Sequence, residues 1–259
     1  MARAVYGYLL LTLIYFYFTN SLVSQWGQPV LIYVETDNVY WLLHMLDIPQ
    51  WILRSKTVSS AFDLLMFASV VLFLIYPNKR IFCLVSLICL WLFQIMYSSA
   101  NGHIYHEVGY LIVPIPFLFR DKLKFYFCWE LIRYWIIFLF TCSGLYKIYY
   151  KGFFKTMNLS LVMRGHFVYS RQRKLVLYLI EHPAVSQLLY KAATFLQLIC
   201  GVGFFTHKRD KWILAALLAF NLGNLYLLNI SFIPNGLVIA PFLPWNRIYL
   251  WWGKNIYHL

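Results

Sequence analysis

Apolar residues recur in long runs from one end of the 259-residue chain to the other, and polar residues gather between the runs. Such runs predict membrane-spanning helices, because a helix needs about 20 predominantly apolar residues to cross a bilayer. The fold class is predicted as all-α, a polytopic transmembrane helix bundle of about eight spans. The predicted spans cover residues 4–20, 61–76, 81–99, 104–119, 126–149, 187–206, 212–231 and 237–252.

Two longer segments separate some of these runs within a single predicted domain, residues 1–259. Residues 21–60 are expected to form an outer loop, and residues 150–186 mix apolar with basic positions, as segments lying along a membrane interface do. The first apolar run follows Arg3 and lacks a clear small-x-small cleavage site. We therefore expect an uncleaved first span rather than a signal peptide.

The composition strengthens the membrane interpretation. Hydrophobic residues make up 62% of the chain and charged residues 12%, whereas soluble domains carry about 25% charged residues. A water-soluble globular fold is thereby excluded. The net charge of +13 would suggest nucleic-acid binding in a soluble protein. In a membrane protein it reflects topology and an anion-attracting surface, so no nucleic-acid partner is expected.

The basic residues also predict orientation, because cytoplasmic loops of membrane proteins carry excess Lys and Arg. The best fit places both termini inside and the short loops 99–103 and 232–236, which have no Lys or Arg, outside. The basic outer segment, residues 150–186, breaks this pattern. Either the span count is wrong by one, or the segment binds an anionic partner such as a carboxylate-bearing substrate or lipid headgroups. The predicted contributors are Arg164, Arg171, Arg173 and Lys174.

Charged residues inside predicted spans are costly and are therefore candidates for function. Glu130 and Arg133 lie three residues apart on one helix face and are predicted to form a structural ion pair. Asp63, near the start of the second span, is expected to cap its helix. Lys147 follows the small pair Ser143-Gly144 near the outer end of the fifth span. Lys147 is either a lysine that extends to the interface or part of a site.

A polar cluster at the same predicted membrane face favours the site. His103, His106 and Glu107 open the fourth span, in the run Asn-Gly-His-Ile-Tyr-His-Glu. A buried lysine can be neutral and can then abstract protons. Lys147, His103, His106 and Glu107 are thus the predicted catalytic residues of an acid–base site. His103 and His106 could instead share a metal, but no third ligand has diagnostic spacing, so no metal is expected.

Other function classes lack their motifs. The chain contains no Walker loop, no GxGxxG and no GxSxG, so ATP-driven transport, dinucleotide binding and α/β-hydrolase chemistry have no support. The two halves show no repeat symmetry, which speaks against a transporter. All five cysteines lie in apolar runs without CxxC spacing, and we interpret them as core residues.

The run Ser-Gly-Leu-Tyr-Lys ending at Lys147, with Arg133 fourteen residues earlier, resembles the fifth-span signature of the HTTM superfamily. This superfamily contains the vitamin K-dependent gamma-glutamyl carboxylases and their bacterial relatives. The segments 101–119, 197–209 and 229–245 are similar to further core helices of the family, and the resemblance covers about residues 60–250.

The resemblance implies that Lys147 is the base that deprotonates a reduced vitamin K. It makes His103 or His106 the active-site histidine and gives Arg133 a mainly structural role. The expected chain is a compact member lacking the family's large luminal domain. Asn221 or Asn224 replaces a family histidine, and the family's Trp-x-x-Gly after the lysine is missing. These departures speak against glutamate carboxylation itself.

Two functions remain open from the sequence. The first is a membrane enzyme with an outward-facing acid–base site at Lys147 and a reduced, vitamin K-like quinone as co-substrate. The alternative is a non-catalytic membrane partner or maturation factor that binds a peptide or protein through the basic outer segment. Membrane lipids are expected partners in both cases. The membrane would be the plasma or inner membrane in a bacterium, and the endoplasmic reticulum in a eukaryote.

Overall fold

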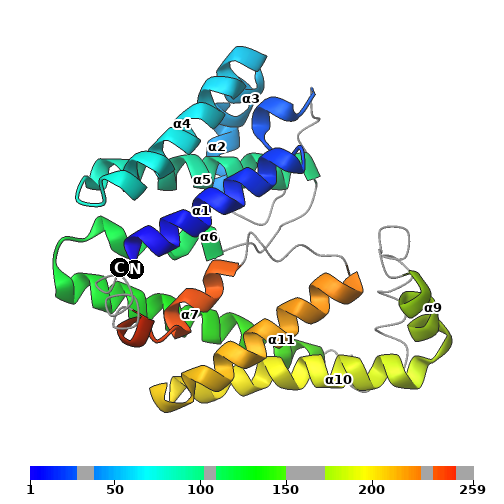
Figure 1. Ribbon diagram of the computed structural model, residues 1–259. Helices are drawn as coiled ribbons and strands as arrows, with labels where there is room; N and C mark the ends of the chain where they lie inside the picture. Colours follow the sequence, from blue (N-terminus) through cyan, green and yellow to red (C-terminus); the bar gives the residue numbers. More distant parts are fainter. Residues whose placement is uncertain (28–37, 102–108, 150–172, 229–235, 249–259) are drawn as a thin grey trace, which may run out of the picture. The chain divides into compact units, whose positions relative to one another are not determined.

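The computed structural model describes residues 1–27, 38–101, 109–149, 173–228 and 236–248 (Figure 1). Over these residues the chain forms α-helices and short 3-10 helices and contains no strand, which confirms the predicted all-α class. In chain order they are α1 Ala2–Phe18, η1 Val23–Gln25, α2 Asn38–Met45, α3 Ile48–Leu53, α4 Lys56–Ile75, α5 Arg80–Asn101, α6 Gly109–Ile112, η2 Ile115–Leu118, α7 Lys122–Tyr149, α9 Arg173–Glu181, α10 Pro183–Ile199, η4 Cys200–Phe204, η5 His207–Arg209, α11 Asp210–Leu228 and η6 Gly236–Phe242.

Five helices among the described residues are long and apolar enough to cross a membrane. Each coincides with a predicted span, so the membrane-protein class agrees with the sequence by length and composition. They are Ala2–Gln25, Lys56–Ile75, Arg80–Ala100, Lys122–Tyr149 and Pro183–Phe204.

Two predicted spans are not continuous α-helices over the described residues, so these two crossings are not confirmed. Within 104–119 the structure has α6, a turn and then η2, and within 237–252 it has η6 followed by a bend. Prolines account for both interruptions, because each lacks a backbone N–H and its ring clashes with the preceding turn. The prolines are Pro114, Pro116, Pro241 and Pro244.

The described chain divides into two compact units, and the first comprises Met1–Cys128 with Ile233–Val238. In it α1 packs on α4, and α4 on α5. Tyr6 of α1 is fully buried: its hydroxyl lies 3.2 Å from Ser86 Oγ on α5, and its ring centroid lies 4.2 Å from that of Phe73 on α4. The first unit is therefore a three-helix core joined by aromatic and hydroxyl contacts.

The start of α4 corrects the role predicted for Asp63. The helix begins earlier than its predicted span, and Ser55 is the N-cap, with its Oγ accepting from the Val58 amide at 3.3 Å. Asp63 lies two turns further along and is buried, and its Oδ2 accepts from the Ser24 amide at 2.8 Å. Asp63 therefore ties η1 to α4 instead of capping its own helix.

The second unit comprises Trp129–Phe232 with Ile239–Leu259. Its long helices include α10 and α11, which run side by side and are joined through η4 and η5 (Figure 1). Glycines bring the elements close together. A Cβ atom at Gly203 would lie 2.6 Å from the Cδ1 atoms of both Ile137 on α7 and Ile213 on α11. Small residues at helix interfaces are typical of membrane proteins, where close backbone packing stabilises the bundle.

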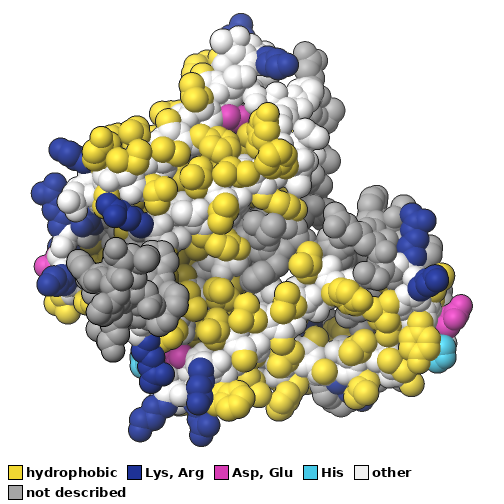
Figure 2. Space-filling view, in the orientation of Figure 1, with side chains coloured by type: hydrophobic (Ala, Val, Ile, Leu, Met, Phe, Trp, Pro, Cys, Tyr) yellow, Lys and Arg dark blue, Asp and Glu magenta, His cyan; other side chains and the backbone are white. Residues whose placement is uncertain are grey.

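The described surface carries many large apolar side chains, although the core is apolar as well. Large apolar side chains are exposed on the outer faces of the helices, among them Leu64 (69%), Leu188 (68%) and Phe195 (61%). Figure 2 shows hydrophobic side chains covering α4 in the first unit and α10 and α11 in the second. Several polar side chains are buried instead, including Ser86 and Gln197. Exposed apolar area of this extent marks a surface that contacts lipid or protein, so the described helices suit a membrane.

Candidate functional site

Lys147, the predicted base, lies in the last turn of α7 and is partly buried. Its Nζ donates to Gln197 Oε1 on α10 at 2.7 Å. The same nitrogen lies 5.5 Å from the ring centroid of Tyr190 and 5.4 Å from that of Phe220. The amine nitrogen thus contacts one amide oxygen and lies within cation–π range of two aromatic rings. We call these residues, with Ser143, the Lys147 site.

Ser143 and Gly144 explain why α10 comes so close to Lys147. A Cβ atom at Gly144 would lie 3.0 Å from Leu198 Cγ, so a larger residue would separate the two helices. Gln197 Nε2 donates to Ser143 Oγ at 3.2 Å. Because Ser143 and Lys147 are four residues apart, they share a face of α7. Gln197 therefore bridges two positions of that face.

Gln197 is a site residue that the sequence prediction missed. It ends a polar line on α10 formed by Gln187, Tyr190, Thr194 and Gln197, whose spacing of three and four residues places them on one face. Gln187, Thr194 and Gln197 are all at most 5% exposed. Polar residues repeating every three or four positions inside an apolar run could have identified Gln197 as a buried site residue from the sequence.

Lys147 has no carboxylate partner among the described residues. Among the described residues, no carboxylate oxygen lies within the 4.0 Å ion-pair distance of Lys147 Nζ. Its described neighbours carry no negative charge, so the amine meets an amide oxygen and two aromatic rings instead of a carboxylate. Such a group favours an anion or a weak acid that can give up its proton.

The remaining predicted catalytic residues belong to a part of the chain that the structure does not describe. His103, His106 and Glu107 lie outside the described residues, so their approach to Lys147 stays a prediction. Within the described part of the chain, no three His, Cys, Asp or Glu side chains come together as a metal-binding group.

The predicted Glu130–Arg133 ion pair is corrected by the structure. Arg133 is 1% exposed and pairs with Asp210, its Nη2 donating to Oδ1 at 2.5 Å and its Nε to Oδ2 at 3.2 Å. Nη2 also donates to the Gly203 carbonyl at 3.1 Å. Glu130 instead lies 3.4 Å from His207 Nε2. Arg133 is directed toward the turn before α11, so it anchors that turn to α7.

The basic outer segment is described only from residue 173. Arg173 and Lys174 begin α9 and are exposed, whereas Arg164 and Arg171 lie outside the described residues. Val176 and Leu179 of α9 are at most 1% exposed. The helix therefore has one buried apolar face and exposed charges at its start.

His44 of α2, which the sequence prediction did not single out, makes two side-chain hydrogen bonds in the first unit. Its Nε2 lies 3.0 Å from Ser99 Oγ. Its Nδ1 accepts a hydrogen bond from the Gln50 amide group, whose Nε2 lies 3.1 Å away. Burial lowers the pKa of His44, although Asp47 opposes the shift. A neutral imidazole thus suits this position.

No protein family, curated protein or solved structure matches the chain.

Proposed function

We propose that this protein is a multi-pass membrane enzyme whose Lys147 site takes a proton from a weakly acidic, apolar substrate. A reduced quinone of the vitamin K type has the right chemistry, because its phenolic hydroxyl is acidic and its ring system partitions into the bilayer. The hydrogen bond of 2.7 Å from Lys147 Nζ to Gln197 carries the proposal. The resemblance to the HTTM superfamily supports the same assignment.

The alternative, a lysine that extends to the membrane surface, accounts less well for these contacts. A lysine of that kind keeps its ammonium group in water. Lys147 Nζ instead donates to Gln197, which is 3% exposed, and lies within cation–π distance of two aromatic rings. In the enzyme proposed here, Gln197 orients the amine and the rings of Tyr190 and Phe220 contact the flat substrate.

The proposed bundle has about eight crossings in total. Helix α11 would be a sixth beside the five long helices, since its 19 residues extend for about 28 Å. The segments 104–119 and 237–252 would make up the other two. Broken backbone is tolerated at membrane depth where protein covers it, and Tyr110, Val113, Leu237 and Val238 are all at most 5% exposed.

The test uses the full chain in lipid nanodiscs and a naphthohydroquinone added without oxygen. A base at Lys147 shifts the bound hydroquinone toward its anion, which is followed by its absorbance band. We expect Lys147→Ala and Lys147→Arg to abolish the band, because neither side chain accepts a proton at neutral pH. Lys191→Ala, which removes an exposed lysine from α10, is the control and retains it.

Two results would contradict the proposal. A band retained in Lys147→Arg would show that positive charge alone is required. Absence of the band in the wild-type protein would exclude hydroquinone deprotonation, and with it the enzyme assignment in this form.

A second candidate is a non-catalytic membrane partner or maturation factor, favoured by the exposed charges and buried apolar face of α9. In that case the basic outer segment binds a peptide, protein or headgroup. Reversing Arg164, Arg171, Arg173 and Lys174 to Glu should then abolish the cellular function while the bundle stays folded. Unchanged function would leave the segment as an anchor.

A further inference from the structure

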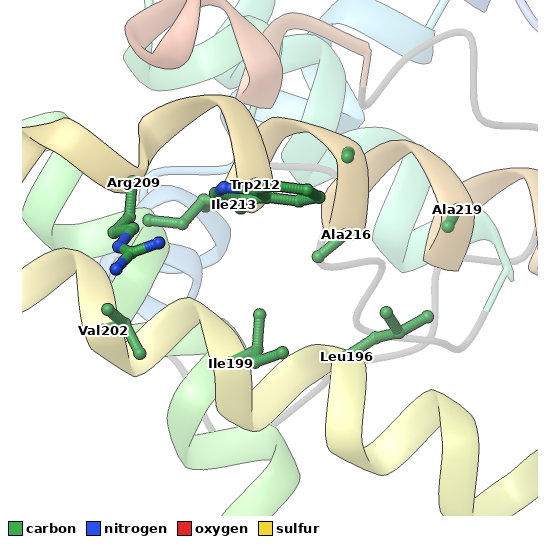
Figure 3. Close-up of a pocket in the computed structure, with 9 residues that line it drawn as sticks. Leu196, Ile199, Val202, Arg209, Trp212, Ile213, Ala216 and Ala219 are labelled. Atoms are coloured by element: carbon green, nitrogen blue, oxygen red, sulfur yellow. The ribbon is translucent and has the colours of Figure 1, made fainter.

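An open groove lies between α10 and α11 in the second unit, with a volume of about 590 Å³ (Figure 3). Figure 3 shows Leu196 and Ile199 of α10 pointing toward α11, whose wall of the groove includes Trp212 and Ala216. The volume of the groove falls within the range of about 300–1,000 Å³ that is usual for small-molecule sites. Its described lining consists of aliphatic and aromatic side chains and one charged residue, Arg209.

The groove exists because small residues face large ones. Helix α11 contributes Ala215, Ala216 and Ala219 to its wall. Alanine side chains are too short to reach the branched residues of α10, so the two helices leave a channel that their own atoms do not fill. Protein interiors are otherwise close-packed. The channel therefore has room for an added hydrocarbon chain.

One end of the groove is positively charged. Arg209 lines it, and Lys208 and Lys211 belong to the same turn and are exposed. The turn's acid, Asp210, is already paired with buried Arg133. Within the described part of the chain, no carboxylate oxygen lies within the 4.0 Å ion-pair distance of these three cations. The end of the groove therefore carries net positive charge.

Trp212 indicates at which level of the bilayer the charged end of the groove lies. It lines the groove next to Arg209 and is 58% exposed. Tryptophan and arginine side by side are typical of the headgroup level of a bilayer. An apolar channel that begins at this level and continues between two membrane helices matches the shape of a lipid, with its head at the surface and its chain below.

We infer that the α10–α11 groove binds a phospholipid with an anionic headgroup. One acyl chain lies between Leu196, Ile199 and Ala219, and the phosphate accepts hydrogen bonds from the Arg209 guanidinium. An arginine fork suits a phosphate group geometrically. The inference does not depend on the chemistry of Lys147, and it requires only that α10 and α11 lie in a bilayer.

The test is native mass spectrometry of the full chain released from detergent, titrated with palmitoyl-oleoyl phosphatidylglycerol or phosphatidylcholine. These two lipids share their chains and differ in headgroup charge. We expect tighter binding of phosphatidylglycerol, and we expect Arg209→Gln to reduce this preference about fivefold, the effect of one cation at an anionic headgroup. Lys208→Gln removes the same charge from the same turn outside the groove and should leave most of the preference.

Filling the groove provides the second measurement. Ala219→Leu places a larger side chain in the channel from an exposed position of α11 and should weaken binding of both lipids. Leu222→Phe enlarges a side chain of the same helix outside the groove, where Leu222 is 59% exposed, and should change neither.

Three outcomes would overturn the inference. Equal binding of the two lipids would exclude an anionic headgroup site. Equal effects of Arg209→Gln and Lys208→Gln would assign the preference to general surface charge. A wild-type dimer that Ala219→Leu dissociates, with lipid binding unchanged, would make the groove an interface between two copies of the chain.

Discussion

Removing the charge of Arg133 is expected to destabilise the second unit strongly. Arg133 is 1% exposed, and its guanidinium donates to both Asp210 oxygens and to the carbonyls of Gly203 and Thr206. Arg133→Met keeps much of the side-chain volume but leaves these acceptors without the donor. Of its ion-pair partners among the described residues, the carboxylate of Asp210, whose side chain is 20% exposed, would then retain His207 at 3.4 Å.

Breaking a buried ion pair by removing one partner costs about 3–5 kcal/mol. Because the Asp210 side chain keeps some contact with solvent, we expect the lower end, about 3 kcal/mol. That loss reduces the ratio of folded to unfolded protein by about two orders of magnitude. The double variant Arg133→Met/Asp210→Leu removes both charges, so it should recover part of the loss, with a coupling of about 2 kcal/mol.

The assay is reversible unfolding by SDS in mixed micelles, followed by tryptophan fluorescence. Glu130→Gln is the matched control, since Glu130 meets His207 at 3.4 Å with both side chains more than 40% exposed. Exposed pairs contribute about 1 kcal/mol or less. Single-variant losses that add within about 0.5 kcal/mol in the double variant would refute the reasoning, because they would show that the two charges do not stabilise each other.

Three further predictions follow from the geometry and the topology. Gly203→Val should lower the unfolding temperature, because its Cβ would enter the space of two isoleucine side chains, whereas Gly223→Val meets nothing within 4 Å; equal shifts in a thermal unfolding assay would contradict this. Because the pKa of His44 is lowered in the folded protein, the unfolded chain binds this proton more readily than the folded chain does. The contribution of His44 to the free energy of unfolding is therefore fully present above about pH 6.5 and is lost as the pH falls below that value. Thermal unfolding between pH 7.5 and 5 should show this loss in the wild type and not in His44→Gln. Cysteines introduced at Ser170 and Lys208 should react with a membrane-impermeant reagent from opposite sides, and labelling from one side would refute the predicted topology.

The class of the fold could be predicted from the sequence because it depends on quantities summed over many residues. Low charge and long apolar runs require a membrane environment, and the bilayer thickness determines how long each helix must be. The five long helices therefore coincide with predicted spans. Prolines interrupt the helix within two of the predicted spans, and whether such a segment still crosses the membrane depends on which neighbours cover the broken backbone.

Side-chain partners could not be predicted in the same way. Spacing along a helix says which residues share a face, and it placed Glu130 beside Arg133. It carries no information about the element that packs on that face. Arg133 meets Asp210, 77 residues away in sequence, and Lys147 meets Gln197, 50 residues away. Gly144 and Gly203 allow neighbouring elements to approach closely, and this packing determines which side chains come within hydrogen-bond distance. A buried polar group without a partner is costly, so each one pairs with a group on the element that packs against it.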